Sequence, residues 1–305
     1  MENTQKSEYD LQTERIDRRM ADISRKIVVM SGKGGVGKTT VAVNLAFALS
    51  EMGKKVGILD CDIHGPNVAK MLGVRDAELY SPDGKTMIPV EAKNGIKVMS
   101  LAFALPDPDD AIIWRGAMKM GVIRQFLGDT EWGTLDYLII DTPPGTGDEQ
   151  LTVVQSIKDI TGAIIVTTPQ EVAILDSRRS VTFARKCGLP IIGVIENMSG
   201  LKCPSCGTEI PVFGKNGGRN MALEMNTPFL GAIPMELDLM KSEDSGEEWI
   251  KDTTHPSAEA LVAIAEKLEN GNACTTGREM NYLGTSSCSP EACAHCTSNC
   301  SSKKS

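Results

Sequence analysis

Residues 27–52 read IVVMSGKGGVGKTTVAVNLAFALSEM, and this stretch decides the fold of the chain. It begins with a run of mostly β-branched apolar residues at 27–30, which predicts a short buried strand. A glycine-rich turn follows, and from Thr39 to Met52 apolar residues recur at helical spacing. The turn at 32–39 matches the phosphate-binding pattern G-x-x-x-x-G-K-[ST] and stands between a strand and a helix, as that pattern requires. The weaker alternative is a glycine-rich turn that binds nothing.

The residue types in this loop fit the binding of a nucleoside triphosphate together with magnesium. Glycines let successive backbone N–H groups converge on phosphate oxygens at the positive end of the following helix. We expect the Lys38 ammonium to meet the β- and γ-phosphates and the Thr39 hydroxyl to ligate Mg²⁺. The predicted ATP-binding residues of the loop are Gly32, Lys33, Gly34, Gly35, Val36, Gly37, Lys38, Thr39 and Thr40.

Two aspartates follow apolar runs elsewhere in the chain. Asp141 ends the run at 137–140, and Asp62 lies just beyond the run that ends at Asp60. Ligands bind at the carboxyl ends of parallel strands. Asp141 therefore fits a carboxylate that acts on Mg²⁺, and Asp62 fits one that orients the attacking water. Each aspartate alternatively caps the helix or turn that follows it.

Short apolar runs alternate with amphipathic stretches along the rest of the chain. This alternation predicts an α/β fold, a doubly wound and mostly parallel sheet with helices on both faces, in a single main domain over 26–270. An inserted hairpin is expected over 86–101. The expected strands are 27–30, 56–59, 137–140, 162–166, 191–195 and 229–233, and the expected helices are 39–52, 115–127, 147–157, 171–187 and 256–268.

The composition excludes several classes of function. The 305 residues are 41% apolar and 24% charged, as in an ordinary globular protein. The net charge is −8 and aromatic residues make up 4%, so we expect neither a basic surface for nucleic acid or anionic lipid nor a base-stacking platform. The chain has no apolar run of about 18 residues and no signal-peptide core, which predicts a cytoplasmic protein without a membrane or nucleic-acid partner.

The two ends of the chain differ from the body. Residues 1–25 are dense in charge and predict a marginal surface helix or a loose arm. Residues 271–305 are rich in Ser, Thr, Asn and Cys, and they have too few aliphatic side chains to fold without help. This tail carries a thiol cluster for which an iron–sulfur cluster, a zinc ion and no fixed metal all remain open. The cluster consists of Cys288, Cys293, Cys296 and Cys300.

Cys203 and Cys206 form a C-x2-C pair in a turn-rich loop. Two thiols at this spacing can hold one metal, and nine cysteines in a reducing compartment favour metal or redox chemistry over disulfides. A cubane cluster or a closed zinc site needs about four ligands, and the body offers no second such pair. The simplest source of the missing ligands is a second copy of the chain related by two-fold symmetry. A redox pair, a bridging zinc site and an idle pair remain alternatives.

Several segments together resemble one protein family. SGKGGVGKTT (31–40) carries an additional lysine, Lys33, that marks the deviant Walker A loop of the MinD-like P-loop NTPases. DCDIHGPN (60–67), DTPPGTGDEQ (141–150), ENMS (196–199) and the cysteine pair resemble the Mrp/ApbC iron–sulfur cluster carriers. The resemblance covers about residues 26–268. It implies a homodimeric ATPase with a labile bridging cluster, of the [4Fe–4S] type. ATP binding and slow hydrolysis would then act as the switch for passing this cluster to apoproteins.

The same resemblance implies roles for individual residues. Lys33 would reach across the dimer to the partner's nucleotide, and Asn197 would contact the adenine. Lys33 and Lys38 would stabilise phosphoryl charge while Asp62 positions water. The segments around Asp62 and at 142–148 resemble switches I and II. The cysteine-rich tail departs from the family pattern, because relatives with an additional four-cysteine cluster carry it at the N-terminus.

Two rival functions share these motifs. A partitioning or division-site ATPase has the same loop but needs a basic amphipathic helix or a basic surface, which this acidic chain does not offer. An ATP-driven electron-transfer reductase resembling the nitrogenase iron protein also bridges a cluster across a dimer, but it takes its two ligands per chain from separate segments. The sequence favours the carrier, and the tail cysteines keep the reductase open.

Overall fold

The structure, a computed structural model, describes residues 6–63, 65–104, 116–203 and 205–271, together with the backbone of 274, 275, 278 and 279. The predicted tail ligands therefore lie outside the described residues; they are Cys288, Cys293, Cys296 and Cys300.

An eight-stranded sheet forms the centre of the molecule, in the order β10-β7-β6-β1-β5-β2-β4-β3. Every neighbouring pair in it is parallel except β3 and β4. The predicted α/β fold with a mostly parallel sheet is thus confirmed. The strands are β1 (Ile23–Ser31), β2 (Val56–Asp60), β3 (Val90–Glu91), β4 (Lys97–Ser100), β5 (Leu135–Asp141), β6 (Gly162–Thr167), β7 (Ile191–Glu196) and β10 (Phe229–Ala232).

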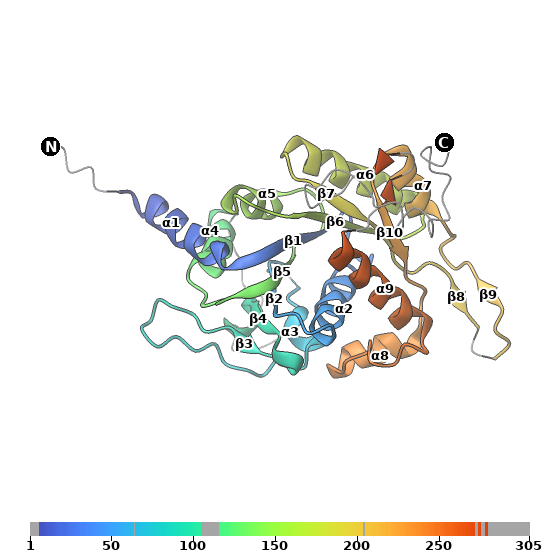
Figure 1. The fold of residues 1–305 in the computed structure, drawn as a ribbon, viewed down its shortest axis with the longest axis horizontal. Coiled ribbons are helices and arrows are strands. Elements are labelled where there is room, and N and C mark those ends of the chain that lie inside the picture. Colours follow the sequence, from blue (N-terminus) through green and yellow to red (C-terminus); the bar gives the residue numbers. More distant parts are fainter. Residues whose placement is uncertain are drawn as a thin grey trace.

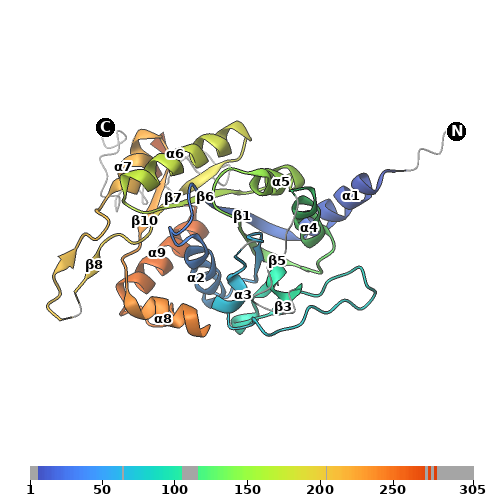
Figure 2. The same cartoon turned by 180° about the vertical axis from the view of Figure 1, so that it is seen from behind.

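Helices cover both faces of the sheet, and each face has its own buried apolar cluster (Figure 1; Figure 2). One face carries α2 (Lys38–Glu51), α3 (Val68–Met71), α8 (Leu237–Ser245) and α9 (Pro256–Asn270). The other carries α1 (Glu8–Ala21), α4 (Gly116–Gly128), α5 (Asp148–Ser156), α6 (Glu171–Lys186) and α7 (Gly217–Glu224). No helix in the described part of the chain is both long and apolar enough to cross a bilayer.

The remaining elements are short. The hairpin expected over 86–101 is present as the antiparallel pair of β3 and β4, and β4 also extends the main sheet beside β2. A second hairpin, β8 (Leu201–Lys202) and β9 (Glu209–Ile210), stands at the end of the molecule opposite α1 (Figure 1). The other short elements are the 3-10 helices η1 (Lys93–Gly95) and η2 (Leu101–Ala104) and the strands β11 (Cys274–Thr275) and β12 (Arg278–Glu279).

Of the two forms expected for the N-terminal arm, a helix is present, and it is docked rather than loose. Ser7 and Asp10 cap its first turn reciprocally, while Ile16 and Met20 are buried against the body. The sheet strand that follows already begins at Ile23, four residues earlier than expected.

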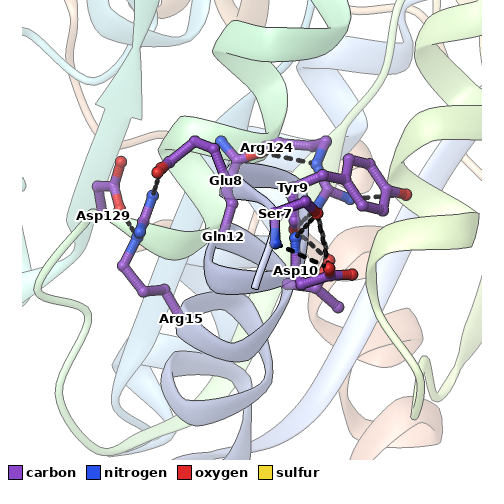
Figure 3. Close-up of polar contacts among 9 residues, drawn as sticks. Ser7, Glu8, Tyr9, Asp10, Gln12, Arg15, Arg124 and Asp129 are labelled. Carbon is purple, nitrogen blue, oxygen red and sulfur yellow. Dashed lines mark hydrogen bonds and ion pairs between the residues drawn. The ribbon is translucent and has the colours of Figure 1, made fainter. Parts of the chain in front are cut away.

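One buried arginine fixes this helix to the domain. Arg124 of α4 donates to Gln12 Oε1 at 2.9 Å and to Thr13 Oγ1 at 2.8 Å, and its guanidinium lies 4.1 Å from the centre of the Tyr9 ring. The same group donates to Ser156 Oγ at the end of α5 at 3.1 Å. Figure 3 shows Arg124 of α4 beside Tyr9 of α1. It also shows Arg15 of α1 between the carboxylates of Glu8 and Asp129.

Candidate nucleotide site and cysteine loop

The predicted phosphate-binding loop (the P-loop, residues 32–39) joins β1 to α2. Gly35 and Gly37 have φ angles of 77° and 76°, in the left-handed region that favours glycine. A Cβ on Gly32 would lie 2.2 Å from the backbone carbon of Asp176 in α6, so the loop also requires glycine where it passes this helix. The backbone therefore has the shape that brings consecutive N–H groups to the start of α2.

The P-loop forms one wall of a cleft of about 430 Å³, a volume in the range of small-ligand sites. The other walls come from the segment after β2, from the loop after β5, and from α8. Most residues predicted from the sequence for the nucleotide site, including Lys33 and Asp62, line this cleft, whereas Gly32 and Asp141 are not among the lining residues. The lining residues are Ser31, Lys33, Gly34, Gly35, Val36, Gly37, Lys38, Thr39, Thr40, Asp62, Gly65, Asn67, Lys70, Met71, Pro144, Met240, Glu243 and Asp244.

Lys38 and Thr39, which line the cleft, both contact Asp141, which is buried beneath them. The Lys38 ammonium lies 2.5 Å from Asp141 Oδ1, and the Thr39 hydroxyl donates to Asp141 Oδ2 at 2.7 Å. Asp141 is fully buried and Lys38 is 6% exposed, so each charge is the main compensation for the other. A hydroxyl and a carboxylate converging here form the oxygen-only donor set that Mg²⁺ prefers, which fits the ligands predicted from the sequence.

Asp60 is a further member of this site that the sequence analysis did not single out. It is 2% exposed and lies opposite Asp141 in the register of β2 and β5. Burial, and next the Asp141 charge, raise the pKa of Asp60 to about 8. Its carboxyl group accepts from the Asp62 N–H and from the Ser100 hydroxyl, both at 3.0 Å. Asp60 thereby ties the start of the segment around Asp62 to the edge of the sheet.

Glu243 is a second residue that sequence reasoning missed, because α8 was not predicted. It accepts from the Thr40 hydroxyl at 3.1 Å and from the Asn44 amide at 3.0 Å, so α8 is bonded to the first turns of α2. Burial is the largest cause that raises the pKa of Glu243 to about 7. A carboxyl group with partly suppressed ionisation is the form best tolerated in a cleft built for phosphates.

Asn197 follows β7 and lies behind the P-loop. Its side-chain amide donates to the Val36 carbonyl at 3.0 Å, and a Cβ on Gly37 would come within 2.1 Å of the same nitrogen. Asn197 is 4% exposed and is absent from the lining of the cleft. In this structure it supports the P-loop, and its contact with an adenine stays a prediction.

The cysteine pair lies at the tip of the β8–β9 hairpin. The Cys203 N–H donates to the Thr208 carbonyl at 2.9 Å and the Gly207 N–H to the Cys203 carbonyl at 2.8 Å, which closes a tight turn around the sulfur atoms. The Cys206 thiol is exposed, and its hydrogen bond with the Thr208 hydroxyl is the main cause that lowers its pKa. A lowered pKa favours the thiolate, the form that binds metals.

The described residues contain no group of three or more His, Cys, Asp or Glu side chains placed to hold a metal ion. The hairpin therefore contributes two thiols and no further ligand of these types from the described part of the chain. Cys61 is a small buried side chain: it is 1% exposed, and burial raises its thiol pKa. Cys187 is half-buried.

Comparisons with known proteins agree with this architecture. An iron-sulfur cluster carrier protein of Methanocaldococcus jannaschii is 55% identical over 236 residues, which are 77% of this chain and 81% of that protein. The cytosolic Fe-S cluster assembly factor NUBP2 of Bos taurus is 44% identical over 253 residues, 82% of this chain and 93% of that protein.

Solved structures of nucleotide-binding proteins have a similar fold. A nucleotide-binding protein of Archaeoglobus fulgidus in complex with ADP matches with a TM-score of 0.70 at 39% identity, covering 81% of this chain and 95% of that one. The septum site-determining protein MinD of Pyrococcus horikoshii, complexed with Mg-ADP, matches with a TM-score of 0.59 at 25% identity, covering 81% and 96%. The family model named ParA, described as NUBPL iron-transfer P-loop NTPase, matches residues 22–269. The resemblance noted in the sequence is thereby confirmed, and the chain belongs to this family of iron-transfer P-loop NTPases.

Proposed function

We propose that this protein binds iron–sulfur clusters and passes them to apoproteins, and that ATP binding and slow hydrolysis are the switch between its holding and releasing states. The observation that carries the proposal is a close pair of thiols, the half-buried Cys203 and the exposed Cys206 with its lowered pKa, on the same domain as the P-loop cleft. The names of the relatives, iron-sulfur cluster carrier protein and cytosolic Fe-S cluster assembly factor, support the same function and a cytoplasmic location.

In this proposal the nucleotide site works with groups already in place. The P-loop N–H groups and Lys38 bind the phosphates, and Lys38 exchanges Asp141 for phosphoryl oxygen. Thr39 and Asp141 would hold Mg²⁺, which neutralises phosphate charge when bound. Asp62, anchored through Asp60, orients the attacking water, and Lys33 stabilises phosphoryl charge on the nucleotide of a partner subunit.

The cluster is the cargo of this cycle, and two copies of the chain hold it. Cys203 and Cys206 supply two thiolates, and a symmetric second copy supplies the other two ligands of a [4Fe–4S] cluster. The tail at 271–305, with its four cysteines, is proposed as a separate metal-binding segment for iron–sulfur or zinc. Because thiolates sharing a symmetry axis are separated when the protomers move, a change at the nucleotide site alters how firmly the cluster is held.

Anaerobic reconstitution of the full-length chain tests the proposal. In a background where Cys288, Cys293, Cys296 and Cys300 are all Ser, we expect about two iron and two sulfide per chain, in a dimer. Changing Cys203 and Cys206 to Ser should remove the bound iron and sulfide, whereas the matched control Cys187→Ser should retain both iron and sulfide. A monomer that binds four iron atoms without these two thiols would overturn the bridging site.

Transfer measurements separate the carrier from its rivals. We expect cluster delivery to an apo-ferredoxin whose rate changes with ATP, and no ATP-driven reduction of a low-potential dye. Electron transfer to the dye without cluster delivery would favour the reductase. Co-sedimentation with DNA or anionic liposomes would favour a partitioning ATPase.

A further inference from the structure

The base of the cysteine loop, residues 200–215, is held by one buried carboxylate. Glu196, the last residue of β7, is 1% exposed. One of its oxygens accepts from the Ser199 hydroxyl at 2.5 Å and from the Asn216 N–H at 3.0 Å, and the other accepts from the Gly218 N–H at 2.6 Å. Ser199 precedes the loop, and Asn216 and Gly218 follow it. A single side chain thus holds both ends of the segment that carries the thiols.

The packing around this carboxylate leaves it little freedom. A Cβ on Gly218 would lie 3.1 Å from the Glu196 Cβ and 2.9 Å from the Thr167 methyl group. Met198 has a positive φ of 56°, an uncommon angle for a side chain of this size, so the turn that brings Ser199 back to Glu196 has a defined shape. A buried charge with three donors is a strong constraint, because losing any donor leaves part of that charge uncompensated.

The residue next to Glu196 touches the P-loop. The Asn197 amide bonds to the Val36 carbonyl, and its own backbone N–H donates to the Thr167 carbonyl at the end of β6 at 2.8 Å. Consecutive residues at the end of one strand therefore contact the nucleotide loop on one side and the base of the cysteine loop on the other. A single peptide unit therefore separates the contact with the P-loop from the Glu196 side chain.

A second connection runs from the cysteine loop to α8. The Met235 N–H donates to the Gly200 carbonyl at 2.8 Å, and the Ser199 N–H donates to the Ile233 carbonyl at 2.9 Å. The segment 233–236 leads directly into α8, whose Glu243 and Met240 line the cleft. The loop base is thus linked to two walls of the cleft, to the P-loop through Asn197 and to α8 through the segment 233–236.

We propose that Glu196 is a positioning residue that couples nucleotide occupancy to the geometry of the Cys203/Cys206 loop. This inference rests on the proposed function, since it assigns the route by which ATP alters the hold on the cluster. Coupling between two sites is reciprocal, so loading the thiols changes nucleotide affinity by the same factor as nucleotide changes affinity at the thiols. Typical coupling corresponds to about 5- to 150-fold in affinity.

Hydrogen–deuterium exchange on the full-length, cluster-free protein tests the coupling without involving cargo. In the wild type, saturating Mg-ADP or a non-hydrolysable ATP analogue changes the exchange rates of backbone amides in 199–216 by about fivefold or more. Glu196→Gln replaces one carboxylate oxygen with an NH2 group that faces N–H donors. The nucleotide-induced change in exchange rate at 199–216 should therefore fall below about twofold. Nucleotide affinity, measured by calorimetry, should stay within about threefold of the wild type.

A matched control and a milder variant complete the experiment. Glu209→Gln changes a carboxylate within the same loop, which pairs with Lys215, and retains the wild-type response. Ser199→Ala removes one of the three donors and weakens the response by a smaller factor, so the inference stays testable where Glu196→Gln unfolds. A full nucleotide response in both Glu196→Gln and Ser199→Ala would overturn the inference, as would equal losses in Glu209→Gln.

A failure of the coupling inference can be distinguished from a failure of the proposed carrier function. Intact coupling in the cluster-free protein, together with failed reconstitution at Cys203 and Cys206, would overturn the carrier function and leave the coupling standing. Reconstitution with ATP-dependent transfer that persists in Glu196→Gln would overturn the coupling role and leave the carrier function standing.

Discussion

The geometry of the Lys38–Asp141 pair allows a quantitative prediction about protein stability in the absence of nucleotide. At the observed 2.5 Å and an effective dielectric constant of about 20, the direct attraction is about 7 kcal/mol. Desolvating two buried ions costs several kcal/mol each, so the pair as a whole contributes little to the free energy of unfolding. Removing only one partner leaves an uncompensated buried charge, which costs about 3–5 kcal/mol.

We therefore expect strong non-additivity between Lys38→Met and Asp141→Asn. Each single change should destabilise the nucleotide-free protein by about 3–5 kcal/mol, the asparagine variant less than the methionine variant because Asp60 can become the counter-ion of Lys38. The double variant should cost only about 0–2 kcal/mol, giving a coupling energy of at least about 3 kcal/mol. Urea unfolding followed by far-UV circular dichroism measures all four proteins. Single-variant costs that add within about 0.5 kcal/mol would refute this account of the site.

The pH dependence of the same variants provides a second check. The pKa of Asp60 is raised from 3.8 to about 8, so the stability that its protonated form contributes is present below about pH 4 and is lost as pH rises from there through about 8. The Lys38 charge is one of the causes that lower this pKa, and removing it extends the loss to higher pH. The penalty of Lys38→Met should consequently grow above about pH 8, and a constant penalty from pH 6 to 9 would contradict the assignment.

Three further predictions concern other parts of the structure. Gly37→Ala adds a Cβ at positive φ that displaces the Asn197 amide, which should lower nucleotide affinity at least about tenfold and stability by about 2–3 kcal/mol, checked by calorimetry and urea unfolding. Arg124→Met breaks the bonds that dock α1; it should cost about 2–3 kcal/mol and expose α1 to limited proteolysis, with nucleotide affinity retained, and an uncut helix would contradict it. As pH rises from about 4.5 through about 7, the free energy of unfolding of the wild type should fall by up to about 3 kcal/mol relative to that of Glu243→Gln. The fall is smaller to the extent that water screens this partly exposed carboxyl group. Equal pH profiles of the two proteins in urea unfolding would exclude the raised pKa.

Much of the fold could be predicted from the sequence because the buried strands are continuous apolar runs. A run such as 137–140 has few alternatives when both faces of a parallel sheet are covered. The helix α8 was missed because its sequence, LDLMKSEDS, has only three strongly apolar residues and its packing is tertiary. The docking of α1 was missed for a related reason: Arg124, which fixes it, lies more than a hundred residues further along the chain.

The candidate site was predictable where a motif specifies backbone geometry and less so where burial decides the role. The P-loop residues and Asp141 follow from spacing at a strand end. Asp60 and Asp62 are two aspartates of one short segment, and only the structure shows that the first is buried beside Asp141 while the second faces the cleft. The sequence marked ENMS as a family segment, but two of the three donors that surround Glu196, Asn216 and Gly218, lie 20 and 22 positions later.

The strand order has a consequence for how the protein is made. β1 is a central strand, yet Val29 pairs with Asp141 and Ile164, roughly 110 and 135 residues away. At translation speeds of about 5–20 residues per second, this apolar strand is synthesised about 6–20 s before β5, its first sheet neighbour to be made. ATP cannot shorten this delay, because the carboxylate that meets Lys38 belongs to that later strand. β1 therefore remains without its sheet neighbours during these seconds, and nucleotide can stabilise only the completed domain.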